Sequence, residues 1–261
     1  MTTPAQIPVD GGDERVIRDV FLSLLCVDSD DLPERMLVVG DPDRALRAAS
    51  RLEGATEIGR FREYVTLVGH HRGTRVGVSS HGVGAAGAAV CFEELFMAGV
   101  HRVIRAGTCG GMQDDVMDGH LVISTGAVRN EGYTSQIVPD GYPALASVEV
   151  VMALRRAAEG AENIHEGVTL TNAAFFTHDI LGSPVPMWQK TGVKAVEMEA
   201  AALFVLAGLA GRQAGAILAV DGDPLAQKNE DMDYYNPHRD VVRDAVGRMI
   251  DIAWDALVDD R

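Results

Sequence analysis

The stretch that decides the fold runs from residue 101 to residue 110 and reads His-Arg-Val-Ile-Arg-Ala-Gly-Thr-Cys-Gly. Its first six residues, centred on Val103 and Ile104, predict a buried strand, and the glycines that follow predict a turn at the strand's end. Arg105 stands inside this apolar run, where a charge is costly to bury unless a partner offsets it. We therefore expect an anion to lie against Arg105.

Two further segments place an arginine beside an apolar run. Gly40-Asp41-Pro42-Asp43-Arg44 follows one such run, and Arg62-Glu63-Tyr64 precedes another. Guanidinium groups and free backbone N–H groups at such turns suit the oxygens of a small anion, phosphate above all. Any one of these arginines alone could be an ordinary surface residue. Arg44, Arg62 and Arg105 together predict a phosphate-like ligand.

Strand and helix patterns alternate along the rest of the chain. The predicted strands are Met36–Val39, a hairpin of Tyr64–Gly69 and Thr74–Ser79, His101–Ala106, Leu121–Ala127, Gly167–Asn172 and Ala214–Asp221. The predicted helices are Pro42–Leu52, Ala85–Ala98, Ala144–Glu159, Met198–Gly211 and His238–Leu257. This order predicts one α/β domain over residues 16–261, with a mixed sheet and helices on both faces, after a flexible tail of residues 1–15. The polar loop 222–237 has the length of a lid.

Composition narrows the function classes. The formal charge of −15 and the isoelectric point near 4.8 disfavour nucleic acid and anionic membranes as partners. Cys26, Cys91 and Cys109 show no paired spacing, which favours a reducing compartment. Residues 1–14 lack the pattern of a signal peptide, so we expect a cytoplasmic protein. The eight histidines show no metal-ligand spacing, and we expect neither a metal nor an organic cofactor.

Three acidic residues and one aromatic residue stand near predicted strand ends. Glu197 and Glu199 lie where a strand passes into a helix, and a carboxylate there suits the two hydroxyls of a ribose. Acids that simply favour a helix start explain the same pair. Asp221 ends an apolar strand and could act as a general acid, or mark only a turn. Phe175 could stack on a base or belong to the core.

A glycine pattern at residues 82–87 invites a different hypothesis. Gly82, Gly84 and Gly87 form G-x-G-x-x-G between a predicted strand and a predicted helix, as in dinucleotide-binding proteins. That fingerprint also needs an acidic residue about twenty positions later. No acidic residue occurs between Glu94 and Asp114. We therefore expect these glycines to serve close backbone approach instead of NAD binding.

Four motifs in this order resemble the nucleoside phosphorylases, the family of hexameric purine nucleoside phosphorylases and uridine phosphorylases. They are Val39–Arg44, Ser80–Gly84, Arg105–Gly110 and Glu197–Glu199, and the resemblance extends over about residues 35–255. The segments Val90–Leu95 and Val220–Gly222 look most similar to the purine nucleoside phosphorylases of apicomplexan parasites. The resemblance implies an α/β fold and a homohexamer built as a trimer of dimers.

The resemblance also implies roles for individual residues. It implies a phosphate site made of Gly40, Arg44, Arg105 and Thr108, with Arg62 supplied by the neighbouring subunit. It implies ribose contacts from Met198 and Glu199, and a base pocket lined by Phe175 and Glu197. Asp221 matches the acid that protonates purine N7. The implied reaction is phosphorolysis of a purine nucleoside to free base and ribose 1-phosphate, with inorganic phosphate as co-substrate.

Departures from the family pattern keep other functions open. Bacterial uridine phosphorylases resemble this chain, but they carry Gln and Arg where Asp179 and Leu181 stand here, which favours a purine. The family's amino-terminal histidine is absent before His70, and Ala173 or Ala174 replaces an acid of the base loop. The alternatives are a uridine phosphorylase, a nucleosidase that uses water, and a nucleoside-binding protein without catalysis. The arginines argue against the nucleosidase, because water needs no anion site.

Overall fold

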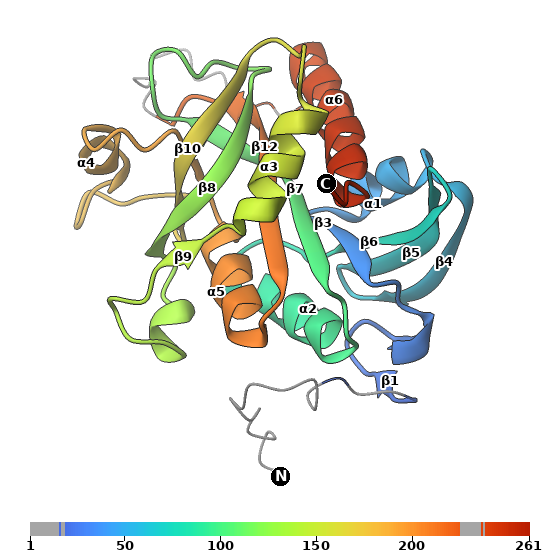
Figure 1. The fold of residues 1–261 in the computed structure, drawn as a ribbon. Coiled ribbons are helices and arrows are strands. Elements are labelled where there is room, and N and C mark those ends of the chain that lie inside the picture. The colour runs from blue at the N-terminus through green and yellow to red at the C-terminus, as the bar shows by residue number, and fades with distance from the viewer. Residues whose placement is uncertain (1–15, 17–18, 225–235, 237) are drawn as a thin grey trace.

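The computed structural model of the protein describes residue 16, residues 19–224, residue 236 and residues 238–261. The predicted tail 1–15 lies outside the described residues, and so does most of the predicted loop 222–237. Within the described part, one large sheet and six α-helices carry the fold (Figure 1).

The sheet contains ten strands in the order β11-β10-β8-β12-β7-β3-β6-β5-β4, with β9 paired to β8. Their bounds are β3 (Arg35–Val39), β4 (Glu53–Phe61), β5 (Tyr64–His71), β6 (Thr74–Ser80), β7 (Arg102–Gly111), β8 (Leu121–Asn130), β9 (Ala144–Leu145), β10 (Ile164–Asn172), β11 (Ala195–Glu197) and β12 (Gln213–Gly222). A separate hairpin pairs β1 (Phe21–Leu22) with β2 (Val27–Asp28).

Strand direction explains where a site can form. Strands β12, β7, β3 and β6 are parallel neighbours, so their carboxyl ends share one edge of the sheet. Strand β11 pairs with β10 and also runs antiparallel to β7, where Ala195 lies opposite Gly111. Because of this second pairing the sheet closes on itself at β11, and the start of the following helix reaches the carboxyl end of β7. The hairpin β5–β6 and strand β4 extend from the closed part (Figure 1).

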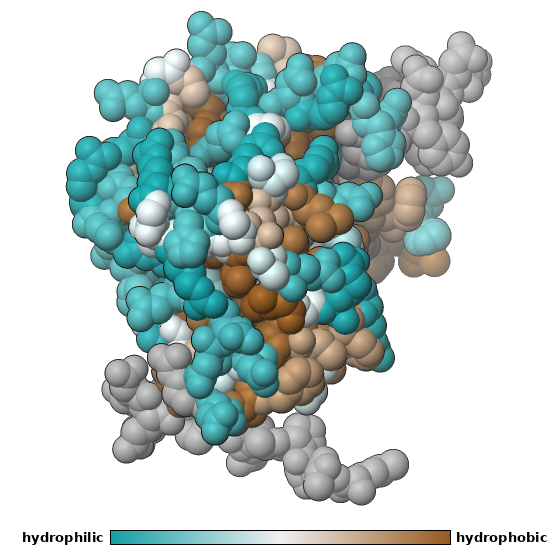
Figure 2. Space-filling model, turned by 90° about the vertical axis from the view of Figure 1, so that its right-hand side faces the viewer, coloured by the Kyte–Doolittle hydropathy of each residue, from teal (hydrophilic) through white to brown (hydrophobic). Residues whose placement is uncertain are grey.

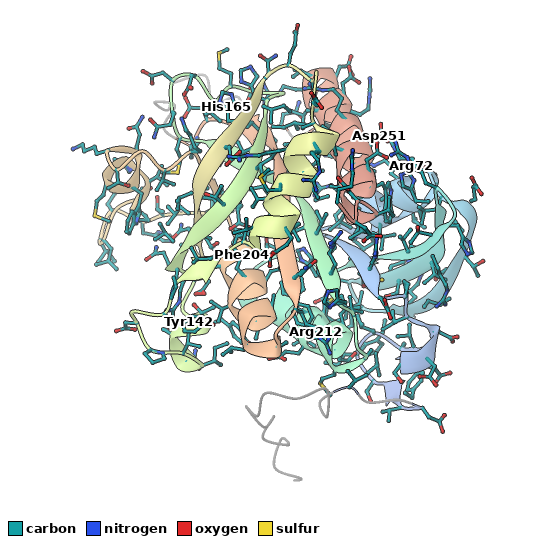
Figure 3. The ribbon with its side chains drawn as sticks, viewed as in Figure 1. Arg72, Tyr142, His165, Phe204, Arg212 and Asp251 are labelled. Carbon is teal, nitrogen blue, oxygen red and sulfur yellow. The ribbon has the colours of Figure 1, made fainter. Side chains whose placement is uncertain are left out.

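The helices pack in two groups. Their bounds are α1 (Pro42–Ala49), α2 (Ala85–Met97), α3 (Val148–Ala157), α4 (Val185–Gln189), α5 (Ala200–Ala210) and α6 (Asp240–Leu257), with short 3₁₀ turns at Ser29–Asp31 and Thr134–Gln136. Helix α3 packs on α6, and α2 packs on α5. Helix α5 is apolar along its whole length, and Phe204 within it is buried in the core (Figure 3). This burial is the main stabilising contribution of such a helix.

Polar contacts tie the outer hairpin to the carboxyl-terminal helix. Arg72, in the turn between β5 and β6, donates to Asp255 of α6 at 2.7 Å (Figure 3). His71 lies 2.8 Å from the other oxygen of the same carboxylate. The indole N–H of Trp254 donates to the carbonyl of Ala48 in α1, which joins α1 to α6. These contacts join the β5–β6 turn and helix α1 to helix α6.

The predicted fold class is confirmed: a mixed sheet with helices packed against it. Several elements differ from the sequence prediction. Strands β1 and β2 and helix α4 were not predicted, and two further differences have a clear physical reason. The helix predicted from Ala144 begins at Val148, because Ala144 and Leu145 pair with β8 as strand β9. Strand β4 was not predicted, since its sequence is polar and contains Gly54 and Gly59. It is an exposed edge strand with two irregularities in register. The β-propensity of a sequence is a weak predictor for such strands, because it mainly reflects packing against neighbouring side chains.

The side of the molecule that carries β4 is mainly hydrophilic, with an apolar band across it (Figure 2). Large apolar side chains that are exposed in the segments β1, α1 and β4 include Phe21, Leu46 and Phe61. Within the described residues, no helix is long and apolar enough to cross a membrane.

Candidate active site

A cavity of about 600 Å³ opens at the carboxyl ends of the parallel strands. Its volume lies within the range of small-molecule sites in proteins. Nine of the ten residues predicted from the sequence line this cavity: Gly40, Arg44, Arg105, Thr108, Phe175, Glu197, Met198, Glu199 and Asp221. The tenth, Arg62, does not line it.

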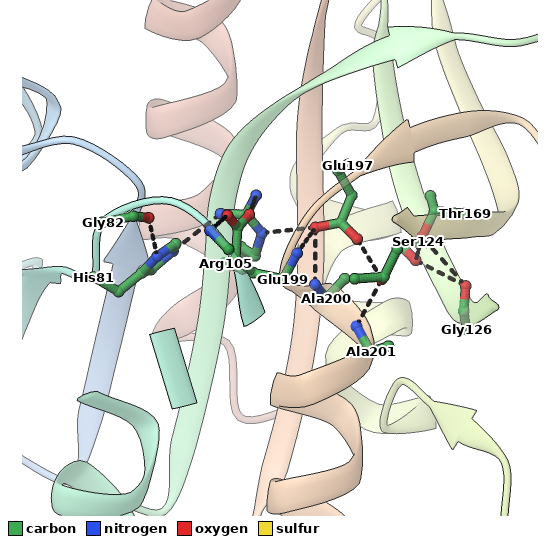
Figure 4. A network of polar contacts seen from close by, with 12 residues as sticks. His81, Gly82, Arg105, Ser124, Gly126, Thr169, Glu197, Glu199, Ala200 and Ala201 are labelled. Carbon is green, nitrogen blue, oxygen red and sulfur yellow. Dashed lines mark hydrogen bonds and ion pairs between the residues drawn. The ribbon is translucent and has the colours of Figure 1, made fainter. Parts of the chain in front are cut away.

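Arg105 is the most deeply buried cation of the site, with a side chain only 4% exposed. It points from β7 toward α5, and Gly107 makes room for it. A Cβ at position 107 would lie 2.7 Å from the guanidinium carbon, so a larger residue there would displace the arginine. Three groups hold the guanidinium: Nε donates to Glu197 at 3.2 Å, Nη2 donates to Glu199, and Nη1 lies 3.0 Å from His81 Nε2 (Figure 4).

These contacts correct one expectation from the sequence. An external anion was expected as the partner of Arg105, but two carboxylates of the chain itself already offset its charge. Burial opposes the charge of Arg105, and the nearby Glu199 and Glu197 outweigh that effect and raise its pKa. The arginine therefore remains a cation whether or not a ligand is bound.

Glu197 holds the centre of the network. Its side chain is completely buried, and its two oxygens accept four hydrogen bonds. The donors are Arg105, the hydroxyl of Thr171 and the backbone amides of Glu199 and Ala200 (Figure 4). Because those amides begin α5, the carboxylate also caps this helix. Glu197 thus joins β10, β7 and α5 at one point.

Glu199 contacts the opposite side of the cavity as well. One of its oxygens accepts the backbone N–H of Gly84 at 2.6 Å, and the other accepts from Arg105. Burial raises the pKa of Glu199, while the nearby Arg105 lowers it in part. Glu197 and Glu199 both contact Arg105, Glu197 from the end of β11 and Glu199 from the residue that precedes α5.

Arg44 is placed by the start of α1. Asp41 caps this helix, and its side chain accepts the amides of Asp43 at 2.8 Å and Arg44 at 3.3 Å, while Pro42 occupies the first helical position. Within the described residues, the buried Nε of Arg44 makes no hydrogen bond. Burial lowers the pKa of Arg44, and the nearby Arg105 lowers it further. Two guanidinium groups thus face one cavity, and among the described residues the buried Nε donor of Arg44 has no hydrogen-bond acceptor.

The other end of the cavity combines an acid with an aromatic ring. Asp221 is buried at the end of β12, beside Cys109 of β7. Burial, reinforced by Asp221, raises the pKa of the Cys109 thiol well above its ordinary value, so this thiol stays protonated and unreactive. Phe175 is 56% exposed and meets Phe176 edge-on, with ring centroids 5.0 Å apart. Asp221 and Phe175 were expected near the base, and both line the cavity.

Sequence reasoning missed several residues of the site. They are His81, behind Arg105, and the lining residues Gly82, Val83, Asn172, Thr177 and Ser183. Asn172 ends β10, accepts from the Asn130 amide at 2.7 Å and donates to the carbonyl of Ala174 at 2.8 Å. It therefore fixes the start of the segment that carries Phe175. Its position at a strand end, next to the predicted aromatic residue, was the signal that could have found it.

Arg62 lies in the turn between β4 and β5 and does not line the cavity of its own chain. Its backbone has a positive φ of 53°, and its guanidinium lies 5.3 Å from the ring centroid of Phe61. The side chain is exposed to solvent. In the part of the chain that the structure describes, no group of three or more His, Cys, Asp or Glu side chains could hold a metal ion.

The comparisons with known proteins agree with this geometry. The family model described as the phosphorylase superfamily matches residues 34–258. A guanosine phosphorylase of Halorubrum lacusprofundi is 35% identical over 89% of this chain and 96% of its own length. A uridine phosphorylase of Treponema pallidum is 36% identical over 79% of this chain and 84% of its own.

A solved structure supports the same relation. The crystal structure of purine nucleoside phosphorylase from Toxoplasma gondii in complex with immucillin-H superposes with a TM-score of 0.86 at 28% identity, covering 93% of this chain and 97% of that one. The family predicted from the motifs is thereby confirmed. The chain belongs to the nucleoside phosphorylases of the phosphorylase superfamily, among relatives named for purine nucleosides and for uridine alike.

Proposed function

We propose that this protein cleaves the N-glycosidic bond of purine nucleosides with inorganic phosphate, giving the free base and ribose 1-phosphate. The observation that carries the proposal is a pair of arginines at one end of the cavity, Arg105 buried and Arg44 partly buried. Arg44 keeps a buried Nε without a hydrogen-bond partner in the described residues. Arg105 has five N–H donors, of which the contacts with Glu197, Glu199 and His81 use three. The remaining donors suit a phosphate ion.

Phosphate binding at this end gains from the neighbouring turns. Thr108 offers a hydroxyl, and Gly40, at the end of β3, offers an approach close to the backbone. An anion there would offset the mutual repulsion of the two guanidinium groups, which lowers the pKa of Arg44. A water nucleophile needs none of these groups, so the arrangement favours phosphorolysis over hydrolysis.

The chemistry follows from the placement of charge. A phosphate oxygen forms a bond to ribose C1′ while the bond from C1′ to the base nitrogen breaks, and positive charge develops on the sugar between them. Holding the anion next to that charge supplies most of the acceleration. Met198 and Glu199 contact the ribose in this proposal. Asp221 donates a proton to purine N7, so that the base leaves without a negative charge.

Residues at the base end support the proposed preference for purine. Asp221 lines the cavity, and N7 is an acceptor that pyrimidines lack. Among the described lining residues there is no glutamine, and the arginines are Arg44 and Arg105 at the phosphate end. Phe175 is placed to cover the base. Glu197 was expected in the base pocket, but its four hydrogen bonds inside the protein support a role in holding Arg105 instead.

Uridine phosphorylase activity is the second candidate. Relatives with that name are as similar to this chain as those named for purines, at 36% and 35% identity. The two reactions need the same phosphate and ribose contacts. They differ only in the contacts made to the base.

The assembly is also a proposal. We propose a homohexamer, built as a trimer of dimers, in which Arg62 reaches the cavity of the neighbouring subunit. Its exposed position beside Phe61, outside the cavity of its own chain, supports this role. The proposal includes a cytoplasmic location and no cofactor beyond the co-substrate phosphate.

One assay separates these functions. Purified protein is given inosine or uridine, each with and without inorganic phosphate, and the release of base is measured. Hypoxanthine release that requires phosphate is the expected result. Preferential release of uracil would establish the second candidate, and release without phosphate would indicate a nucleosidase. Binding of nucleoside in calorimetry without any release would indicate a protein that binds nucleosides and does not cleave them.

A further inference from the structure

His81 lies behind Arg105, at the point where β6 ends. The residue is completely buried, and its backbone N–H donates to the carbonyl of Val39 at 2.9 Å, so it continues the β3–β6 pairing. Its ring packs edge-on against Phe92 of α2, with centroids 5.3 Å apart. A buried, hydrogen-bonded imidazole in this position has one fixed orientation.

The partners of the two ring nitrogens define where the proton sits. Nδ1 lies 2.8 Å from the carbonyl oxygen of Gly82, which can only accept, so Nδ1 carries the hydrogen. Nε2 lies 3.0 Å from Nη1 of Arg105, which can only donate, so Nε2 presents its lone pair. Both contacts are satisfied together only by the neutral imidazole with hydrogen on Nδ1 (Figure 4).

We propose that His81 is a positioning residue for phosphate binding: its neutral imidazole accepts a hydrogen bond from Arg105 and fixes the guanidinium that faces the anion. The inference rests on the proposed function, because it names the anion as phosphate. Glu197 and Glu199 hold Nε and Nη2, and His81 holds Nη1. With all three nitrogens anchored, the plane of the guanidinium is set before a ligand binds.

The surrounding charges keep His81 neutral. Arg105 and Arg44 are the cations nearest to the ring, and a second positive charge at 3.0 Å from Arg105 would be repelled. Burial, and then Arg105, hold the pKa of His81 well below its ordinary value. A lysine or arginine at this position could not accept the hydrogen bond. A carboxylate could accept it, but it would bring a third negative charge to Arg105.

Two substitutions and one control test the inference. His81→Leu removes the acceptor and keeps an apolar side chain of similar size. His81→Gln retains a carbonyl oxygen near the place of Nε2. Ser124→Ala is the matched control, because Ser124 is also completely buried and hydrogen-bonded, to Thr169 at 2.9 Å, but does not contact Arg105. For each protein, phosphate binding is measured by calorimetry, and kcat and KM are measured for inosine and for phosphate.

We expect His81→Leu to weaken phosphate binding and raise the KM for phosphate about 10- to 100-fold, the effect of losing one hydrogen bond to a charged group. The KM for inosine should change much less. His81→Gln should recover most of the loss, and Ser124→Ala should resemble the wild type. Phosphate affinity in His81→Leu equal to that of Ser124→Ala would overturn the inference.

A second measurement uses the wild-type protein, so its result does not depend on whether a variant folds. Nitrogen NMR of ¹⁵N-histidine-labelled protein should show His81 as neutral imidazole with hydrogen on Nδ1, with and without phosphate. An imidazolium, or hydrogen on Nε2, would overturn the inference even if the enzyme is active. Wild-type protein that neither binds nor uses phosphate would instead overturn the proposed function, whatever the state of His81.

Discussion

The network around Arg105 and the segment that carries Phe175 border the same cavity, yet the protein holds them very differently. Arg105 is 3% exposed and is anchored by three side chains that come from β6, β11 and the start of α5. In the segment after β10, Phe175 is 56% exposed, and Ile180 and Leu181 are 91% and 97% exposed. One end of the site is set by intramolecular bonds, and the other is open.

This difference suggests how one fold can be shared by relatives named for purine nucleosides and for uridine. The proposed phosphate and ribose end depends on buried charges, whose partners cannot change without a large cost. The proposed base end depends on exposed side chains, which can be exchanged cheaply. Relatives named for guanosine and for uridine share the family at nearly equal identity, as expected if the open segment decides the base.

Removal of Arg105 should break the fixed end of the site completely. Arg105→Ala leaves Glu197 and Glu199 buried without their cation, and it removes donors to phosphate. We expect phosphate-dependent base release to fall at least about 1,000-fold and the free energy of unfolding to fall by about 3–5 kcal/mol. Steady-state kinetics and urea denaturation measure the two effects. Arg60→Ala, at an exposed arginine paired with Glu57, is the control and should behave as wild type.

A near-normal rate in Arg105→Ala would show that Arg44 alone binds the anion. A normal rate with lowered stability would assign Arg105 to the fold and not to the reaction.

Asp221 tests whether the acid acts on the base. Asp221→Asn keeps the shape of the side chain but removes the acidic proton, so inosine phosphorolysis should slow about 100-fold. Uridine cleavage, which offers no N7, should slow much less. The ratio of the two kcat/KM values is the measurement. Asp223→Asn is the control at an exposed cavity residue two positions later. Equal losses for both nucleosides would remove Asp221 from base protonation.

Phe175 probes the open end. Phe175→Ala removes the ring proposed to cover the base and should raise the KM for inosine about tenfold, which corresponds to the lower part of the range for stacking of a base on an aromatic ring. The value of kcat and the KM for phosphate should stay nearly constant. Phe176→Ala is the matched control, because Phe176 is 77% exposed and does not line the cavity. A fall in kcat comparable to that of Arg105→Ala would contradict the contrast between the two ends.

The last and smallest predicted effect is the contribution of His81 to the pH dependence of the free energy of unfolding. Since the pKa of His81 is lowered in the folded protein, the unfolded chain binds a proton below its ordinary pKa of 6.5 that the folded chain does not. Stability is therefore lost as the pH falls below 6.5, with a slope of up to about 1.4 kcal/mol per pH unit. His81→Gln lacks this contribution, whereas the raised pKa of Glu199 is retained in both proteins. Urea denaturation between pH 5 and pH 8 should give a shallower decline for the variant; parallel curves would contradict a neutral His81.

Much of the fold followed from local pattern. Strands β3 and β12 and helix α2 have bounds close to those predicted, because each pattern is set by residues adjacent in the chain. The turn predicted after Ala106 was wrong: β7 continues to Gly111, because residues 107–110 pair with β12. The site residues were named by motif, and nine of the ten meet in one cavity. Strand β4 escaped prediction because an exposed edge strand needs no apolar alternation.

The sequence by itself determined that an arginine inside the apolar run 103–107 marks a site with special chemistry, since burying a charge demands a partner. Only the tertiary structure decided which groups offset the charge of Arg105. Glu197 and Glu199 lie 92 and 94 residues away along the chain, and they meet Arg105 because β11 closes the sheet against β7. His81 precedes Arg105 by 24 residues in the chain and contacts it from the end of β6. Local pattern carries the need for a counter-charge, but long-range strand pairing chooses which groups supply it.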